Sequence, residues 1–121
     1  MNKLKSSDYL KHVQRLQSIE YDITKRKNAD YAWKDLAFKN FDMVEQLGIC
    51  SAETGILVRL TDKLSRIINL LNTNSERQVL DESISDTLTD MANYARILNI
   101  YLLTKPTLWT AENSIDMQLD S

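Results

Sequence analysis

The sequence has little cysteine, histidine, glycine or proline, and each shortage narrows what the protein can be. Cys50 is its only cysteine and His12 its only histidine. An intrachain disulfide and a cysteine-cluster zinc site are therefore excluded, and a histidine-rich metal site or a Ser-His-Asp triad within one chain is nearly excluded. Two glycines and one proline in 121 residues are few for sheets joined by tight turns. The composition favours long helices, and any metal must be held by oxygen ligands.

Extreme charge and long apolar runs are also missing. The formal net charge of -2 argues against a dedicated nucleic-acid-binding protein, so no direct contact with nucleic acid is expected. No window approaches the roughly 18 apolar residues of a membrane span. The N-terminal MNKLKSSDYLK lacks the apolar stretch of a signal peptide. These absences predict a cytoplasmic protein with no membrane partner.

The length corresponds to about one domain. We expect residues 1–105 to form a single helical domain, because the residue before Pro106 avoids the helical region and the last helix must stop there. Residues 106–121 are polar with a few apolar positions. They are expected to form a C-terminal tail that is disordered or packs against a neighbour.

In the first half of the chain, apolar residues at spacings of three and four predict one amphipathic helix. It begins at Ser6 or Ser7 and ends near Lys27. A short helix or irregular loop is expected next, followed by a helical turn over 43–47 that Gly48 closes in a left-handed conformation. The stretch between them contains aromatic residues that either pack in a core, which is the commoner case, or stack on a base: Tyr31, Trp33 and Phe41.

Two further long helices are predicted in the second half. One begins at the N-cap Ser51 and ends near Asn72; the other follows a capping box over 75–78 and ends near Thr104. The first of these carries a broad apolar face, made of Ile56, Leu57, Leu60, Leu64, Ile67, Ile68 and Leu71. The core face of the last helix is expected to be Ile84, Leu88, Met91, Ala95, Leu98 and Leu102.

An acidic stripe lies on this last helix. Glu82, Asp86 and Asp90 fall within a sector of roughly 80°, and Asn93 joins them one turn later. Like charges at i,i+4 repel, so a divalent cation or a basic partner must compensate them. Carboxylates in a partly dry site suit magnesium, which takes one or two of them together with phosphate oxygens.

A basic stripe occupies the preceding helix, where Arg59, Lys63 and Arg66 recur at i, i+4 and i+7 with Asp62 beside them. Because the connecting turn is short, the two helices are expected to pack antiparallel, with the stripes within reach of each other. The arginines could then grip a phosphate while a metal sits on the acids. Simple interhelical salt bridges explain the stripes equally well, and such surface pairs contribute little.

Four stretches of the sequence resemble a phage-associated family, nucleotide modification associated domain 1. They are KNADYAW, NFDMVEQLGI, GILVRLTDKLSRIINLL and LDESISDTLTDMANYA, and the resemblance runs from about Lys27 to Tyr101. The family is similar to the all-alpha nucleoside triphosphate pyrophosphatases, the MazG-like and dimeric dUTPase group. The resemblance implies an all-α, four-helix-type bundle that assembles as a dimer or larger oligomer in the cytoplasm, the host's if the gene is a phage gene.

The resemblance also implies roles for individual residues. A nucleotide would lie between helices, with Mg²⁺ on acidic side chains. The catalytic and metal-binding residues would be Glu82, Asp86 and Asp90. The phosphates would face Arg59, Lys63 and Arg66, and the base or sugar would face Asp30, Tyr31, Asn93 and Tyr94.

One departure leaves several functions open. MazG-like enzymes present acidic pairs on two helices, whereas the helix with RLTDKLSR offers only Asp62. The chain could be a Mg²⁺-dependent pyrophosphohydrolase of nucleotide metabolism or modification, a non-catalytic protein that sequesters nucleotides against a host defence, or a helical inhibitor of another protein. Homo-oligomers are expected because the last helix carries apolar and aromatic residues away from its core face: Tyr94, Ile97, Tyr101 and Leu103.

Overall fold

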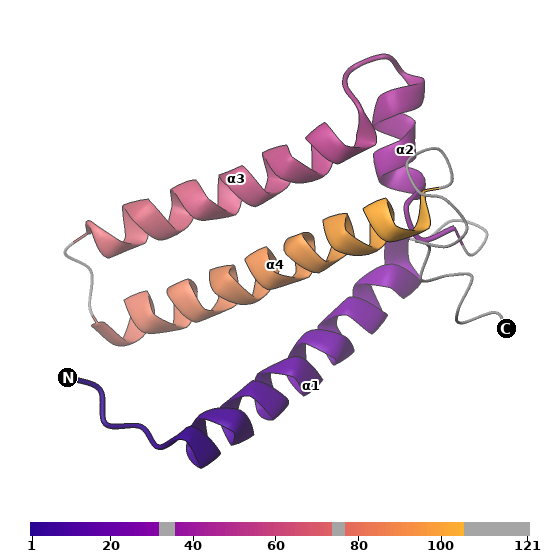
Figure 1. Cartoon of the computed structure of the whole chain (residues 1–121). Coiled ribbons are helices and arrows are strands. Elements are labelled where there is room, and N and C mark those ends of the chain that lie inside the picture. Colours follow the sequence, from indigo (N-terminus) through magenta and orange to yellow (C-terminus); the bar gives the residue numbers. More distant parts are fainter. Residues whose placement is uncertain (32–35, 74–76, 106–121) are drawn as a thin grey trace, which may run out of the picture. The chain divides into compact units, whose positions relative to one another are not determined.

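The computed structural model describes residues 1–31, 36–73 and 77–105, and the side chains of all of these except 30–31 and 77–81. Every regular element in these ranges is an α-helix, as the sequence predicted (Figure 1). The helices are α1 (Ser6–Tyr31), α2 (Lys39–Gln46), α3 (Ala52–Leu71) and α4 (Arg77–Thr104). None of them is both long and apolar enough to cross a membrane. Contacts divide the chain into a first unit, Met1–Ala37, and a second that begins at Phe38.

The first unit is built on α1, which continues to Tyr31 and not only to Lys27 as predicted. The four extra residues, Asn-Ala-Asp-Tyr, include no glycine or proline, so nothing in them stops a helix that has already formed. Several large apolar side chains of α1 are exposed, among them Leu10, Leu16 and Ile19.

The second unit begins with α2, a helix of eight residues, in the region where the sequence predicted a short helix or irregular loop followed by a turn over 43–47. Gly48 ends it with a φ of 75°, the left-handed conformation that glycine adopts without a steric penalty. Ser51 then caps α3, and its Oγ accepts a hydrogen bond from the backbone N–H of Thr54 at 3.1 Å. Both of these predictions are confirmed. Trp33, the tail over 106–121 and Ser75, on which the predicted capping box over 75–78 depends, lie outside the described residues.

Helices α3 and α4 run antiparallel, side by side, as the short connection between them predicted (Figure 1). The core sits where this hairpin meets α2. Ala52 and Ile56 are fully buried there, and Tyr101 of α4 is buried against them. Four further side chains pack around this cluster: Phe38, Phe41, Ile97 and Leu98. Phe41 therefore has the packing role that was the commoner expectation for the aromatic residues.

Polar contacts tie the ends of the three helices together around Tyr101. Its hydroxyl donates to Asp42 Oδ1 at 3.2 Å, and its ring meets Phe38 edge-on with centroids 5.3 Å apart. Burial, and then the nearby Asp42 carboxylate, raise the pKa of Tyr101 to about 12.

A second contact at this junction joins α3 to the end of α4, where Lys105 Nζ donates to Glu53 Oε1 at 2.5 Å. The hydrogen bond lowers the pKa of Glu53 and raises that of Lys105. The ends of α2, α3 and α4 are therefore joined by both apolar packing and charge.

The structure confirms Leu98 of the predicted core face of α4 and corrects other positions on this helix. Tyr101 and Ile97, expected to face away from the core, belong to it, and Leu88 of the predicted core face is about half exposed. Part of the reason lies in the helix contact: α4 meets α3 through three polar contacts, which a search for apolar periodicity passes over. Tyr101 and Ile97 are therefore not free for an oligomer contact, and oligomerisation itself stays a prediction.

An apolar face is nevertheless left open on the hairpin. Leu57, Leu64, Ile68 and Leu71 of α3 are each 46–64% exposed. Helix periodicity and the antiparallel register place them on the same side as Leu88 of α4. Exposed apolar patches of this kind mark contact surfaces, so the hairpin itself gives a reason to expect a second copy.

The raised pKa of Tyr101 predicts a specific loss of stability in alkali. A phenol whose pKa is higher in the folded protein contributes stability that is complete below its ordinary value of 10.0 and disappears as the pH rises through about 12. Tyr101→Phe should cost about 1 kcal/mol at neutral pH through the lost hydrogen bond. Urea unfolding between pH 10 and 12 should then show a shallower decline for the variant than for the wild type. Tyr9→Phe, at an exposed position on α1, is the control, and equal slopes for Tyr101→Phe and wild type would contradict the assignment.

The open apolar face predicts self-association. Light scattering should give a mass at least twice the 14.0 kDa of one chain. Leu64→Glu should reduce it to one chain, because a buried unpaired carboxylate opposes the contact. Ser65→Glu adds the same charge at the neighbouring exposed position on the polar side of α3 and should leave the mass unchanged. A wild-type protein of single-chain mass would count against this use of the face.

Candidate functional site

A row of three polar contacts joins α3 to α4. Arg59 donates to the hydroxyl of Tyr94 from Nε at 3.3 Å and from Nη2 at 3.0 Å. Lys63 Nζ lies 3.5 Å from Asp90 Oδ2. Arg66 Nε donates to Thr87 Oγ1 at 3.2 Å. We call this row the polar ladder.

The ladder follows from the spacing of the basic residues. From Arg59, the partners on α3 advance by four and then three residues, while those on α4 retreat from Tyr94 by four and then three. Steps of four and three keep residues on one face of a helix. An antiparallel neighbour with the same steps in reverse then meets every rung, so the predicted approach of the two helices is confirmed along the whole basic stripe.

The rungs differ in their chemistry. Thr87 is almost fully buried, and its hydroxyl also donates to the carbonyl oxygen of Ser83 at 2.7 Å. Arg66 therefore meets a fixed neutral acceptor. Arg59 likewise meets a phenol, over whose ring its guanidinium lies at 5.7 Å from the centroid. Lys63 alone faces a carboxylate in the ladder, and both side chains of this pair are partly buried, with 28% and 29% exposed.

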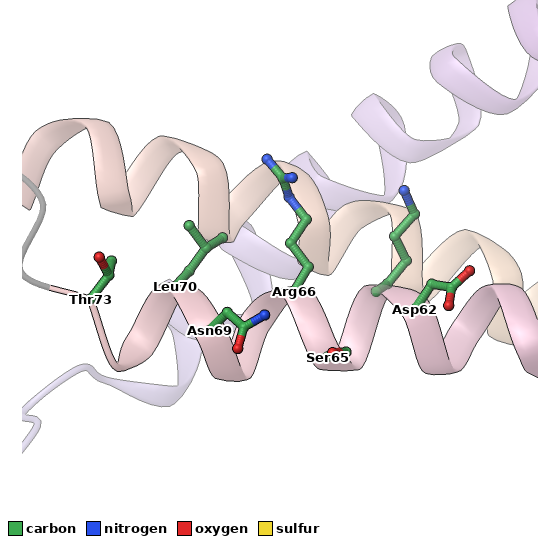
Figure 2. Close-up of a pocket in the computed structure, with 7 residues that line it drawn as sticks. Asp62, Ser65, Arg66, Asn69, Leu70 and Thr73 are labelled. Atoms are coloured by element: carbon green, nitrogen blue, oxygen red, sulfur yellow. The ribbon is translucent and has the colours of Figure 1, made fainter.

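An open depression of about 600 Å³ lies along the polar side of α3. In Figure 2, Arg66 and Leu70 extend from α3 toward α4. Basic, amide and hydroxyl groups predominate in its lining, which consists of Asp62, Lys63, Ser65, Arg66, Asn69, Leu70 and Thr73. The hydrogen bond to Thr87 uses only the Nε of Arg66. Its terminal guanidinium nitrogens are therefore available to an anion in the depression.

The acidic stripe is not gathered into one cluster. Glu82 and Asp86 are exposed on α4, while Asp90 is occupied by Lys63. Among the described residues, no group of three or more His, Cys, Asp or Glu side chains is placed to hold a metal ion. As arranged, the three carboxylates do not fit a preassembled magnesium centre, and their metal-binding and catalytic roles stay predictions.

The residues expected to face the base or sugar are separated. Asn93 is buried, and its Oδ1 accepts from Arg96 Nη1 at 3.1 Å, whereas the adjacent Tyr94 belongs to the ladder. Asp30 and Tyr31 are the last two residues of α1, and their side chains lie outside the description. Of the predicted set, the structure therefore brings together Arg59 with Tyr94 and Lys63 with Asp90.

Several polar residues of the site were missed from the sequence. Thr87 is the clearest case, because it lies three residues before Asp90 and so shares its face. Ser65, Asn69 and Thr73 of the depression gave no signal of their own. Short polar side chains on an exposed helix face are common, so only the neighbouring Arg66 marks them.

Comparison with known proteins identifies the family. Residues 25–102, more than half of the chain, match the model of nucleotide modification associated domain 1. The chain belongs to this family. No curated protein and no solved structure gave a match. The match covers α2, α3 and nearly all of α4, so the polar ladder and the depression both lie within the nucleotide modification associated domain.

The Lys63–Asp90 rung predicts a measurable coupling in stability. In a cycle of Lys63→Met, Asp90→Asn and the double variant, the coupling should be about 0.5 to 1 kcal/mol at low salt, the upper range for partly exposed pairs. Added salt should reduce it. Urea unfolding of all four proteins supplies the values.

A second ion pair of the same types serves as the control for this cycle. Lys11 and Asp8 of α1 are 3.8 Å apart with side chains 79% and 51% exposed. Their coupling should be smaller than that of Lys63 and Asp90. Equal couplings in the two cycles would mean that the rung behaves as an ordinary surface pair.

Proposed function

We propose that this protein binds the phosphate chain of a nucleotide in the depression along α3. The observation that carries the proposal is the pair of cations, Lys63 and Arg66, in an open depression within a chain of the nucleotide modification associated domain 1 family. Guanidinium groups bind phosphate oxygens through two parallel hydrogen bonds. The terminal nitrogens of Arg66 can make this contact while its Nε keeps Thr87.

The rest of the lining suits an anion. The hydroxyls of Ser65 and Thr73 and the amide of Asn69 can donate hydrogen bonds to phosphate or sugar oxygens. Arg59 extends the line of positive charge along α3 toward the core. Among the described side chains, Asp62 is the one acidic group in the lining. Its carboxylate would repel a phosphate close by, or accept a hydrogen bond from the sugar.

Whether the nucleotide is cleaved is a separate matter. The sequence likeness to MazG-like pyrophosphatases favours a triphosphate as the ligand and hydrolysis as an activity. The exposed Glu82 and Asp86 and the paired Asp90 favour binding without cleavage. We therefore place nucleotide binding first, as in a protein that sequesters nucleotides or assists an enzyme that modifies them.

A ligand panel tests the proposal. Linear and cyclic nucleotides are mixed with the protein, binding is measured by calorimetry, and the nucleotide is recovered and analysed by chromatography. At least one should bind and raise the melting temperature, since a ligand of the native state must stabilise it. Recovery of the intact ligand supports sequestration, and release of pyrophosphate supports the hydrolase.

A matched pair of variants locates the site. Arg66→Met should weaken binding roughly tenfold or more, because a hydrogen bond to a charged group is lost. Arg15→Met removes an arginine of α1 outside the matched residues 25–102 and should bind as the wild type does. If no nucleotide changes the melting temperature, the proposal fails, and the helical protein-inhibitor alternative gains.

A further inference from the structure

We propose that Lys63 takes the place of a divalent cation beside Asp90, so that the phosphate chain binds as a metal-free anion. The inference rests on the proposed function for its ligand. It concerns a different point, the form in which that ligand is recognised.

The position of the ammonium group supports this assignment. Lys63 Nζ lies 3.5 Å from Asp90 Oδ2, with both side chains about 70% covered. A cation at this distance in a partly dry site compensates much of the carboxylate's charge. A metal ion entering at Asp90 would therefore have to displace the lysine and leave its charge uncompensated, which is costly in a partly buried place.

The remaining carboxylates offer little to a metal. Glu82 and Asp86 are exposed, and neither lines the depression. Magnesium requires nearly ideal octahedral geometry and gives up its water reluctantly. In the part of the chain that the structure describes, no set of three acidic, histidine or cysteine side chains meets such a requirement.

The depression can receive an anion without a metal. Lys63 lines it together with Arg66, so an ammonium that compensates Asp90 on one side is available to phosphate oxygens on the other. An ammonium has three donors. Lys63 can thus contact the Asp90 carboxylate and a phosphate oxygen at the same time. In magnesium-dependent proteins the metal ion makes this connection.

Calorimetry with inorganic triphosphate tests the inference in two buffers, one with EDTA and one with excess magnesium. Wild-type protein should bind at least as tightly in EDTA, because magnesium competes with the protein for the phosphate oxygens. Lys63→Met should weaken binding in EDTA about tenfold, the equivalent of one lost charge-assisted hydrogen bond. Lys63→Arg should retain binding, and Lys11→Met, a paired lysine on α1, should match the wild type.

Manganese binding to the protein alone separates this inference from the proposed function. By electron paramagnetic resonance, wild-type protein should leave the signal of free Mn²⁺ unchanged. Stoichiometric loss of that signal, abolished in Asp90→Asn, would overturn the inference whether or not any phosphate binds. Triphosphate binding seen only with magnesium would overturn it too while leaving nucleotide binding intact. Absence of binding in both buffers, with free Mn²⁺ unaffected, would instead remove the proposed function, and the metal-free ligand with it.

Discussion

The contact between α3 and α4 is the constraint on which the rest of the second unit depends. Three polar rungs, Arg59–Tyr94, Lys63–Asp90 and Arg66–Thr87, fix the register of α3 against α4. If the basic residues stood one position further along the sequence, each would be rotated by about 100° around α3 and would no longer face α4. The apolar cluster of Ala52, Ile56 and Tyr101 then falls at the end where α2 can cover it. The spacing of the basic residues on α3 therefore sets the register of the two helices, and with it the positions of the core and of the depression.

Much of this architecture is readable from the sequence, and the reasons are local. Gly48 marks the end of α2 because glycine adopts a positive φ, and Ser51 marks the start of α3 because its side chain caps the helix. The short link after α3 makes the next helix antiparallel. The face of α4 that packs against the core could not be predicted in the same way. Apolar periodicity identified Leu88 as a core residue, but the pattern cannot tell whether an apolar face packs against its own chain or against another one. Tyr101 was not assigned to the core because its side chain combines an apolar ring with a polar hydroxyl.

The candidate site shows a similar division. The basic stripe was visible because charged residues at i, i+4 and i+7 must share a face. The acidic stripe was equally visible, but whether its carboxylates gather or spread depends on side-chain placement: Asp90 turns to Lys63 while Glu82 and Asp86 remain in solvent. Periodicity predicts neighbours on a helix, and it does not predict which of them converge on one ion.

Under the proposed function, the residues of the ladder have two roles, holding α3 and α4 together and binding the ligand. A side chain that had to release its partner in order to bind would weaken the hairpin whenever the site filled. Arg66 avoids this cost because the Nε–H fixes it to Thr87 and the opposite edge of the guanidinium remains for phosphate. The buried Thr87 hydroxyl, itself fixed to the Ser83 carbonyl, keeps that edge aimed before any ligand arrives. Such preorganisation lowers the ordering cost of binding, and this is how the proposed anion site could form on a surface as open as this one.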